Sequence, residues 1–341
     1  MFFFRKTPKI SSSSRSVSCL EKIEIGGTEQ WLLMRGKSVR LPVMLWLHGG
    51  PGSAQIGFAP YFQRELEQHF VVVNWDQRGA GLSYRKNTST DMMNVDQFIA
   101  DAREVTEYLQ DKFRQNKIFI VGHSWGSILG IKLAERYPEL YHAYIGIGQV
   151  VQMVKGERLS YEYTLREAKE AGHAKAEREL VALGEDSFYD YRKLATQRKW
   201  LGHFKGVMYR QPMEKVIVPR MIRSSEYNLM DMIRFIKGSR FSIKHMWAEV
   251  CNINLEKVTQ LQVPVFLCMG RHDYNTPFEL AEAFFNNLKA PLKTWEWFEE
   301  SAHCPNFEEP EKFNKHLIYL LRHEMNGLSV MNTADHKMRT P

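Results

Sequence analysis

A single serine stands between two glycines in the stretch Gly122-His123-Ser124-Trp125-Gly126. The apolar run KIFIVGH before it predicts a strand and the run SWGSILGIKLAERY after it predicts a helix, so the serine falls in the turn between them. In such a Gly-x-Ser-x-Gly turn the serine takes a strained backbone conformation, and its hydroxyl stands above the sheet. The free N–H groups at the start of the following helix favour negative charge. The stretch therefore predicts a nucleophilic Ser124, with a helix-capping serine as the alternative.

A nucleophilic serine needs a base, and the base needs a carboxylate that orients it. Asp273 stands in RHDYNTP, directly after the strand-like run VPVFLCMG, and His303 stands in EESAHCPNFEEP, after the next strand-like run. Loops at the carboxyl ends of strands collect active-site groups in open α/β sheets. We therefore predict that His303 takes the proton of Ser124 and that Asp273 orients His303. The alternative for Asp273 is a solvated loop acid.

The third chemical requirement is a pair of donors for the oxygen that becomes negative during attack. The segment LHGGPGSA at 47–54 follows a strand-like run, and its glycines let the backbone approach a substrate oxygen closely. It lacks the Lys-Ser/Thr ending of a phosphate-binding loop. We predict that the N–H groups of Gly50 and Trp125 form this oxyanion hole, with a tight turn of no catalytic role as the alternative.

These loops require a sheet that holds them at one edge. Strand-like runs with nearly continuous apolar character lie at 41–47, 70–75, 117–121, 141–150, 263–269 and 293–298. Such runs are typical of strands covered on both faces, as in a mainly parallel sheet. KIEIGG and TEQWLLMRG predict a leading antiparallel hairpin, and the apolar spacing over 94–113 predicts a helix with one buried face. Thr276-Pro277 predicts another helix start, with the threonine as its cap.

The alternation of strands and helices stops between about 151 and 258, where Lys- and Glu-rich helical sequence replaces it. We predict a core at 21–150 and 259–327, and a helical cap, or lid, at 151–258. Residues 1–20 are basic, serine-rich and free of acids, which predicts a disordered N-terminal tail, with a transit peptide as the alternative. Residues 328–341 lack periodicity and predict a flexible C-terminal tail.

Composition excludes several other classes of function. The 341 residues carry a net charge of +7, but charges of both signs are interspersed and no basic run alternates with aromatics, which argues against nucleic-acid binding. No apolar segment approaches the roughly 20 residues that a membrane-spanning helix needs. The four cysteines lack metal-ligand spacing and are sparse for a disulfide framework. We expect a cytoplasmic protein without a membrane, nucleic-acid or metal partner.

Five motifs occur in order along the chain: HGGPG at 48–52, DQRGAGLS at 76–83, GHSWGS at 122–127, GRHDYNTP at 270–277 and SAH at 301–303. Together they resemble the α/β-hydrolase branch that contains the proline iminopeptidases. The resemblance implies a mostly parallel eight-stranded sheet, a helical cap inserted after the sixth strand, and no metal or organic cofactor. It implies a serine hydrolase that forms an acyl-enzyme and releases an N-terminal residue from small peptides or amides. For the second motif we expect Asp76 and Arg78 to hold the loops around the oxyanion turn.

The sequence indicates the substrate less clearly than it indicates the catalytic residues. Iminopeptidases bind the free amino group through cap carboxylates and usually carry a Trp-Glu-Gly element, whereas this chain has KWLGHFKG at 199–206. We predict Glu226 as the amine anchor and Glu249 as the second candidate, with solvated helix acids as the alternative. Candidate pocket-lining aromatics, which could equally form the core of the cap, are Trp200, Phe204, Tyr227 and Trp247. The functional alternatives are an ester or lactone hydrolase on the same residues and a non-catalytic small-ligand receptor.

Overall fold

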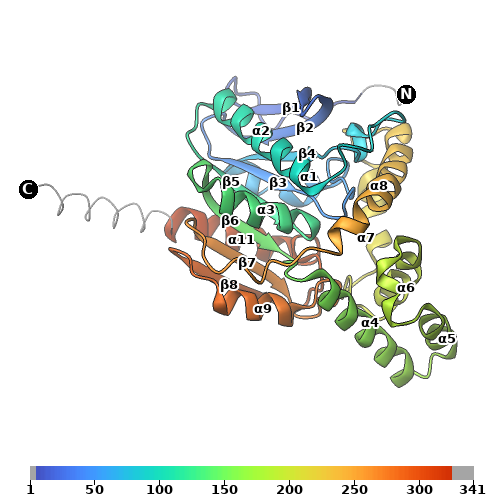
Figure 1. The fold of residues 1–341 in the computed structure, drawn as a ribbon. Helices are drawn as coiled ribbons and strands as arrows, with labels where there is room; N and C mark the ends of the chain where they lie inside the picture. Colours follow the sequence, from blue (N-terminus) through green and yellow to red (C-terminus); the bar gives the residue numbers. More distant parts are fainter. Residues whose placement is uncertain (1–4, 325–341) are drawn as a thin grey trace, which may run out of the picture.

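An eight-stranded sheet with helices on both faces forms the centre of the computed structural model, which describes residues 5–324 (Figure 1). The strands are β1 Val17–Ile25, β2 Thr28–Gly36, β3 Val43–Leu47, β4 Val71–Asp76, β5 Ile118–His123, β6 Tyr141–Ile147, β7 Val265–Gly270 and β8 Lys293–Phe298. Their order across the sheet is β1-β2-β4-β3-β5-β6-β7-β8. The leading hairpin is antiparallel and β4, β3, β5, β6, β7 and β8 run parallel, which confirms the predicted mostly parallel sheet.

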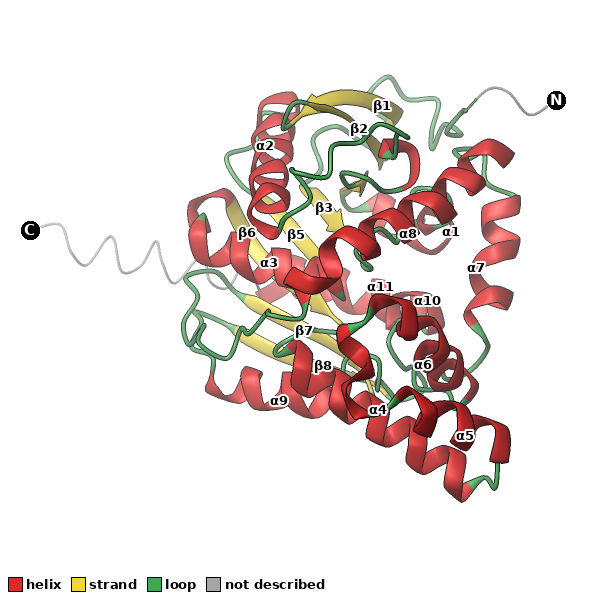
Figure 2. Ribbon diagram, turned by 45° about the vertical axis from the view of Figure 1, so that its right-hand side comes forward, coloured by secondary structure: helices red, strands yellow, loops and turns green. Residues whose placement is uncertain are grey.

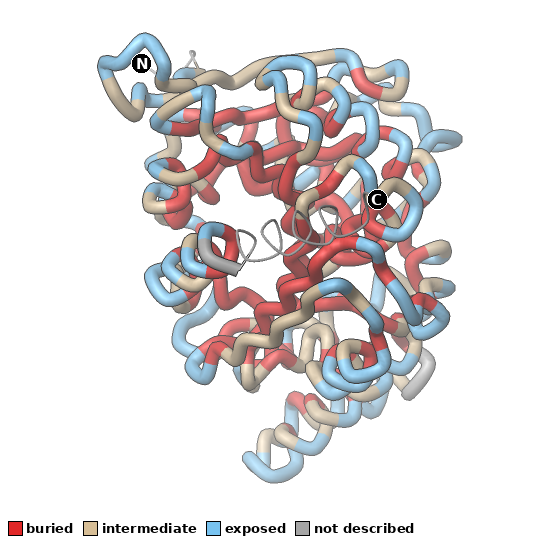
Figure 3. The backbone as a smooth tube through the Cα atoms, turned by 90° about the vertical axis from the view of Figure 1, so that its left-hand side faces the viewer, coloured by how far each residue is buried: buried red, intermediate tan, exposed pale blue. Residues whose placement is uncertain are grey.

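The parallel strands are apolar on both faces because helices cover both. Side chains alternate between the two faces of a strand. In β3, Leu45 and Leu47 pack into the cluster that contains the apolar faces of α2 Val95–Phe113, α3 Trp125–Arg136 and α9 Phe278–Asn287. Met44 and Trp46 of the same strand pack instead into a second cluster, which contains α11 Pro310–Tyr319. Figure 3 shows buried backbone through the centre of the sheet, with exposed residues along the outer elements.

Strand register places the loops that matter side by side. In the parallel pair of β3 and β5, Leu47 lies opposite Gly122, so the HGGPG loop and the turn at Ser124 leave the same edge of the sheet. In the parallel pair of β7 and β8, Gly270 lies opposite Phe298, and the loops with Asp273 and His303 follow at that same edge. The carboxyl ends of these parallel strands therefore gather the residues that the sequence singled out.

Helices replace strands between β6 and β7. They are α4 Met153–Glu170, α5 Ala174–Leu183, α6 Tyr191–His203, α7 Met213–Ile222 and α8 Leu229–Val250. Figure 2 shows α4, α5 and α6 grouped at one end of the molecule, while α7 and α8 lead back along the side of the sheet. The first three share a small core of their own around Tyr161, Leu180 and Trp200. The five helices follow the sixth strand and lie between residues 151 and 258.

The N-terminal segment departs from its prediction. The sequence predicted a disordered tail at 1–20, but β1 begins at Val17, and the segment before it contacts the folded core. The Arg5 guanidinium forms an ion pair of 2.7 Å with Asp231, whose side chain is fully buried, at the start of α8. Arg35 donates to the carbonyl of Pro8 over 2.8 Å. These partners lie far away in the sequence, so local composition could not reveal them. The predicted tail at 328–341 lies outside the described residues.

None of the helices within residues 5–324 is both long enough and apolar enough to cross a membrane.

Candidate active site

The turn at Ser124 has the strained geometry that the motif predicted. β5 ends at His123, α3 begins at Trp125, and Ser124 between them has φ of 55° and ψ of −119°. A positive φ is costly for any residue with a Cβ and persists where the surroundings enforce it. The glycines are required by close packing, because a Cβ at Gly126 would overlap the backbone of Leu47. The serine is thereby held at the edge where β3 and β5 end.

Asp273 and His303 are in direct contact. The Oδ2 atom of Asp273 lies 2.9 Å from Nδ1 of His303, and the exposed fractions of the two residues are 0% and 4%. The other carboxylate oxygen accepts hydrogen bonds of 2.9 Å from the N–H groups of Asn275 and Thr276. The carboxylate therefore faces Nδ1 of the imidazole and leaves Nε2 available for another partner, which is the orientation a base needs.

Thr276 also contacts this pair of side chains, a role that was not predicted for it. Its hydroxyl donates to Oδ2 of Asp273 over 2.8 Å and lies 3.1 Å from Nδ1 of His303. The prediction of Thr276 as a helix cap was wrong, because α9 begins at Phe278 and its N-cap position is Pro277. A buried carboxylate needs several donors, and a threonine three residues further along a loop is well placed to supply one.

Ser124 and His303 line one cavity. Within the described part of the chain no hydrogen bond joins the two side chains, and such contacts commonly tighten only once substrate is bound. The carbonyl of His303 lies 3.0 Å from Nε2 of His123, which donates to it. Burial lowers the pKa of His123 to about 3, so this ring is neutral at ordinary pH and acts as a support for the His303 loop.

Two backbone N–H groups beside Ser124 are free to bind an oxyanion. Gly50 and Trp125 line the same cavity as Ser124. Among the described residues neither N–H has a hydrogen-bond acceptor. Gly50 has φ of 113°, a conformation open to glycine, and Trp125 is the first residue of α3, whose leading N–H groups have no partner within the helix. Both are placed as an oxyanion hole requires.

Gln77, which was not among the predicted site residues, joins these two donor segments. Its Oε1 accepts a hydrogen bond of 3.0 Å from Nε1 of Trp125, and its Nε2 donates to the carbonyl of His48 over 3.2 Å. Its own N–H donates to Nε2 of His48. Burial lowers the pKa of His48 to about 4, so the ring stays neutral and Nε2 can accept.

The preceding residue, Asp76, supports the same loops. It accepts hydrogen bonds of 2.8 Å from the N–H of Leu82 and 2.5 Å from the hydroxyl of Tyr227, and a longer one from the N–H of Ile56. Burial raises its pKa to about 7. These contacts agree with the expectation that Asp76 holds the loops around the oxyanion turn.

Arg78 was expected to share this role, and that expectation was wrong. It pairs with Asp101 of α2 over 2.8 Å and donates to the carbonyl of Gly26 in the leading hairpin.

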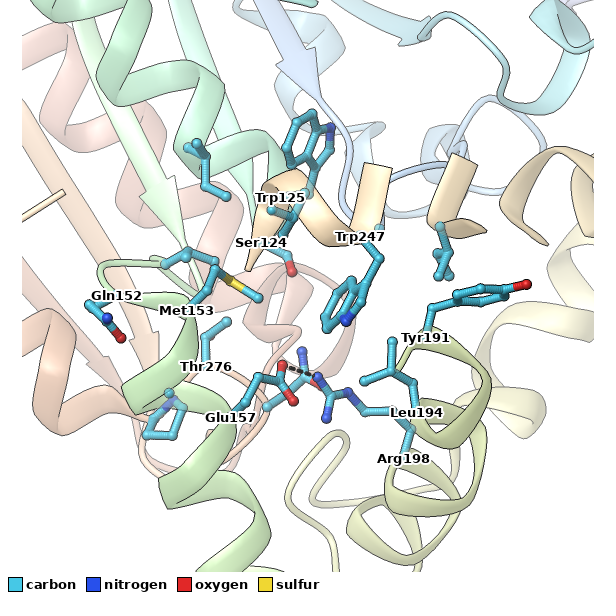
Figure 4. Close-up of a pocket in the computed structure, with 18 of the residues that line it drawn as sticks. Ser124, Trp125, Gln152, Met153, Glu157, Tyr191, Leu194, Arg198, Trp247 and Thr276 are labelled. Carbon is cyan, nitrogen blue, oxygen red and sulfur yellow. Dashed lines mark hydrogen bonds and ion pairs between the residues drawn. The ribbon is translucent and has the colours of Figure 1, made fainter. Parts of the chain in front are cut away.

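Two cavities meet at Ser124. The first has a volume of about 640 Å³. Apolar side chains that include Met153, Leu194 and Trp247 line it (Figure 4). The second, of about 800 Å³, contains His303. The residues common to both are Gly50, Ser124, Ala195, Arg198 and Asn275.

Glu157 is the acidic side chain that lines the first cavity, and it was not among the predicted residues. Figure 4 shows it across the cavity from Ser124, in an ion pair with Arg198. Glu157 is 4% exposed, and its Oε2 atom is buried without a hydrogen-bond partner among the described residues. Helical spacing could have found it, because Glu157 stands four residues after Met153 on the buried face of α4.

The predicted amine anchors lie elsewhere. Glu226 accepts hydrogen bonds from Ser224 and Ser225 and lines another cavity, between α7 and the N-terminal segment. Glu249 accepts hydrogen bonds of 3.1 and 3.0 Å from the N–H of Val95, the first residue of α2. Neither residue lines the two cavities that contain Ser124, because Glu226 closes a local turn and Glu249 caps a core helix, where its charge is favourable.

The four predicted aromatics divide between the cavities and the core. Trp247 lines the first cavity, and Trp200 lines the second while its Nε1 donates to Glu179 over 2.8 Å. Phe204 packs against the core of α4, α5 and α6, and Tyr227 is buried with its hydroxyl on Asp76, so neither lines these cavities.

Within residues 5–324 no three His, Cys, Asp or Glu side chains gather closely enough to hold a metal ion.

The sheet order, the cap between β6 and β7 and the turn at Ser124 together define an α/β-hydrolase. The family model described as "Serine aminopeptidase, S33" matches residues 39–310, and the chain belongs to this family. It is an enzyme family of hydrolases, and the resemblance to proline iminopeptidases that the five motifs indicated is confirmed.

Individual relatives agree with this placement. The probable aminopeptidase YbaC of Bacillus subtilis (strain 168) is 36% identical over 314 residues, which cover 91% of this chain and 98% of that protein. The proline iminopeptidase of Heyndrickxia coagulans is 25% identical over 284 residues, covering 80% and 87%. The crystal structure of the proline iminopeptidase of Mycobacterium smegmatis has a TM-score of 0.65 at 17% identity, covering 91% and 100%, and so shares the fold.

Proposed function

We propose that this protein is a serine hydrolase that forms an acyl-enzyme and acts as an aminopeptidase on small peptides or amides. The observation that carries the proposal is the contact of 2.9 Å between Asp273 and His303, in a cavity shared with Ser124 and two free backbone N–H groups. A nucleophile, a base, an orienting carboxylate and an oxyanion hole are the parts that acyl transfer needs.

The proposed reaction has two stages. The Oγ atom of Ser124 attacks the substrate carbonyl carbon while Nε2 of His303 takes its proton, and Asp273 stabilises the resulting imidazolium. The carbonyl oxygen becomes negative and is held by the N–H groups of Gly50 and Trp125. The C–N bond then breaks as His303 returns the proton to the leaving nitrogen. Water attacks the acyl-enzyme with His303 again as base, releasing the acid and restoring Ser124.

Glu157 supports the aminopeptidase form of this proposal. It lines the first cavity across from Ser124, and one of its buried carboxylate oxygens has no partner among the described residues. An ammonium group in this cavity would be attracted to the Glu157 carboxylate, so Glu157 replaces Glu226 and Glu249 as the proposed amine anchor. The apolar wall formed by Ile128, Leu194 and Trp247 suits an apolar N-terminal residue, proline included.

Ester or lactone hydrolysis on the same residues is the second candidate. It is favoured by the ion pair between Glu157 and Arg198, which already neutralises the carboxylate, and by the mostly apolar wall around it. The amino group of the substrate separates the two candidates, because an esterase does not need it.

Labelling by a fluorophosphonate probe, followed by assays on matched substrates, tests the proposal. The wild type is expected to react with the probe, whereas Ser124→Ala is not, and equal labelling of both would remove Ser124 as the nucleophile. Prolyl and leucyl 4-nitroanilides should be hydrolysed at least tenfold faster than their N-acetylated forms and short acyl esters. The reverse order would identify an esterase, and probe labelling without turnover of any substrate would favour a receptor.

A further inference from the structure

The cavity that contains His303 differs from the one that contains Glu157, although both open onto Ser124. We infer that the His303 cavity receives the leaving group, and that it selects peptides whose second residue is bulky and apolar. This inference rests on the proposed acyl-enzyme function of Ser124. It places the acyl part of the substrate in one cavity and the leaving group in the other.

The assignment follows from where the proton must go. In the first stage His303 takes a proton from Ser124 and gives it to the leaving nitrogen, so that nitrogen must lie on the His303 side of Ser124. His303, Cys304 and Phe307 line the second cavity and are absent from the first. Trp125, one of the oxyanion donors, lines the first cavity and is absent from the second. The acyl part of the substrate therefore occupies the Glu157 side, and the amine product leaves on the His303 side.

The wall of the second cavity is suited to an apolar group. Phe58 and Phe307 pack edge to face with ring centres 5.4 Å apart at one side of it. Met208 and Ile217 belong to the same buried cluster and also line the cavity. Its volume of about 800 Å³ exceeds that of the first cavity, of about 640 Å³.

Two basic side chains of this wall already have acidic partners: Arg198 pairs with Glu157, and Lys199 pairs with Glu179 over 2.8 Å. The apolar surface of this wall favours an aromatic or aliphatic side chain over a small or charged one.

Two helical glycines provide a matched pair of probes. Gly202 of α6 lines the second cavity, and a Cβ built there would meet nothing within 4 Å. Gly156 of α4 lines the first cavity, and a Cβ there would meet Leu280 and Pro277 at 3.8 Å, an ordinary contact. Neither glycine has a positive φ. The first side-chain atom therefore has room at either position without backbone strain, so we expect leucine to occupy part of the adjoining cavity, and leucine is a better helix former than glycine.

The experiment compares Gly202→Leu and Gly156→Leu with the wild type on two dipeptide amides, leucyl-phenylalaninamide and leucyl-glycinamide. For the wild type we expect kcat/KM to be at least tenfold higher with phenylalaninamide as the leaving group. Gly202→Leu should reduce this ratio at least tenfold, whereas Gly156→Leu should lower both values by the same factor. Burst kinetics with leucine 4-nitrophenyl ester then measure the rate of deacylation, a step that takes place after the leaving group has departed. That rate should change in Gly156→Leu, because its leucine would lie on the acyl side of Ser124.

The outcomes separate this inference from the function on which it rests. If the wild type shows a burst but Gly202→Leu lowers kcat/KM for both amides equally, the assignment of the cavities is overturned while the acyl-enzyme stands. If Gly156→Leu alone changes the ratio, the two cavities have the opposite roles. If the wild type forms no acyl-enzyme with any substrate, the proposed function fails and this inference fails with it.

Discussion

The indole Nε1 of Trp125 donates a hydrogen bond to Oε1 of Gln77 over 3.0 Å, and this bond ties the start of α3 to the loop after β4. Gln77 also binds both the ring and the carbonyl of His48, two residues before Gly50. One buried amide thus connects the two segments whose N–H groups form the proposed oxyanion hole. Gln77 touches no reacting atom, so we regard it as a positioning residue.

Replacing Gln77 by leucine should therefore impair transition-state binding more than substrate binding. We expect Gln77→Leu to lower kcat by about tenfold, roughly 1.4 kcal/mol, with KM changed less than twofold. Steady-state kinetics on an aminoacyl 4-nitroanilide measure the split. Gln110→Leu is a suitable control, because its amide bonds the carbonyl of Asn116 at the surface. A rise in KM with unchanged kcat would contradict a positioning role.

Loss of the Thr276 hydroxyl should weaken the link between Asp273 and His303. The hydroxyl donates to the buried carboxylate over 2.8 Å, and valine has nearly the same shape without a donor. We expect Thr276→Val to reduce kcat/KM by roughly tenfold, since a hydrogen bond to a charged group contributes about 1.5–3 kcal/mol. Thr276→Ser keeps the donor and should restore most of the activity. If serine and valine are equally impaired, packing of the methyl group matters and the hydroxyl does not.

Glu157 should control the response to a free amino group. We expect Glu157→Gln to raise KM for free-amine anilides about tenfold or more, because the charged partner of the ammonium is lost, and to spare N-acetylated substrates. Glu226→Gln is the matched control, since Glu226 is also buried but lines a separate cavity. Equal effects of Glu157→Gln on free and acetylated substrates would show that the residue supports the cap and does not bind the amine.

Asp76 should make stability depend on pH. Burial raises its pKa from 3.8 to about 7, so the folded protein binds this proton more tightly than the unfolded chain does. The contribution of this group to the free energy of unfolding is therefore greatest in acid and is lost as the pH rises through about 7.

Relative to Asp76→Asn, which cannot ionise, the wild type should lose stability between about pH 4 and pH 7, because the carboxyl ionises near 3.8 in the unfolded chain and only near 7 in the folded protein. Urea denaturation at several pH values measures the difference. Asp96→Asn, whose parent side chain is 77% exposed, should show no such trend. If the difference in the free energy of unfolding between the wild type and Asp76→Asn stayed constant with pH, the raised pKa would be contradicted.

Replacing a glycine of the Ser124 turn by alanine should change the stability of the protein in the opposite direction from the same replacement at an open helical glycine. A Cβ at Gly126 would overlap the Leu47 carbonyl, whereas a Cβ at Gly202 would meet nothing within 4 Å. We expect Gly126→Ala to lower the free energy of unfolding by about 1–3 kcal/mol or more, and Gly202→Ala to raise it by about 0.5–1 kcal/mol. Denaturant unfolding tests both, and a neutral Gly126→Ala would show that the turn has room to relax.

The amino-acid sequence by itself determined the order of elements and the positions of Ser124, Asp273 and His303. These follow from local patterns: glycines around a serine at a strand end, and loops directly after two buried strands. Because parallel strands deliver such loops to one edge of the sheet, the contact between Asp273 and His303 could be expected before any coordinates were known.

Only the tertiary structure decided which cap residues face the cavities. Glu157, Glu226 and Glu249 all stand in the helix-rich cap region, and their local sequence does not say which packs toward Ser124, toward a turn, or onto the start of α2. The orientation of each cap helix depends on partners far away in the chain, such as Arg198 for Glu157 and Val95 for Glu249. For the same reason, hydrophobic periodicity and sequence motifs could not predict the contacts of Gln77 or the contact of Arg5 with Asp231.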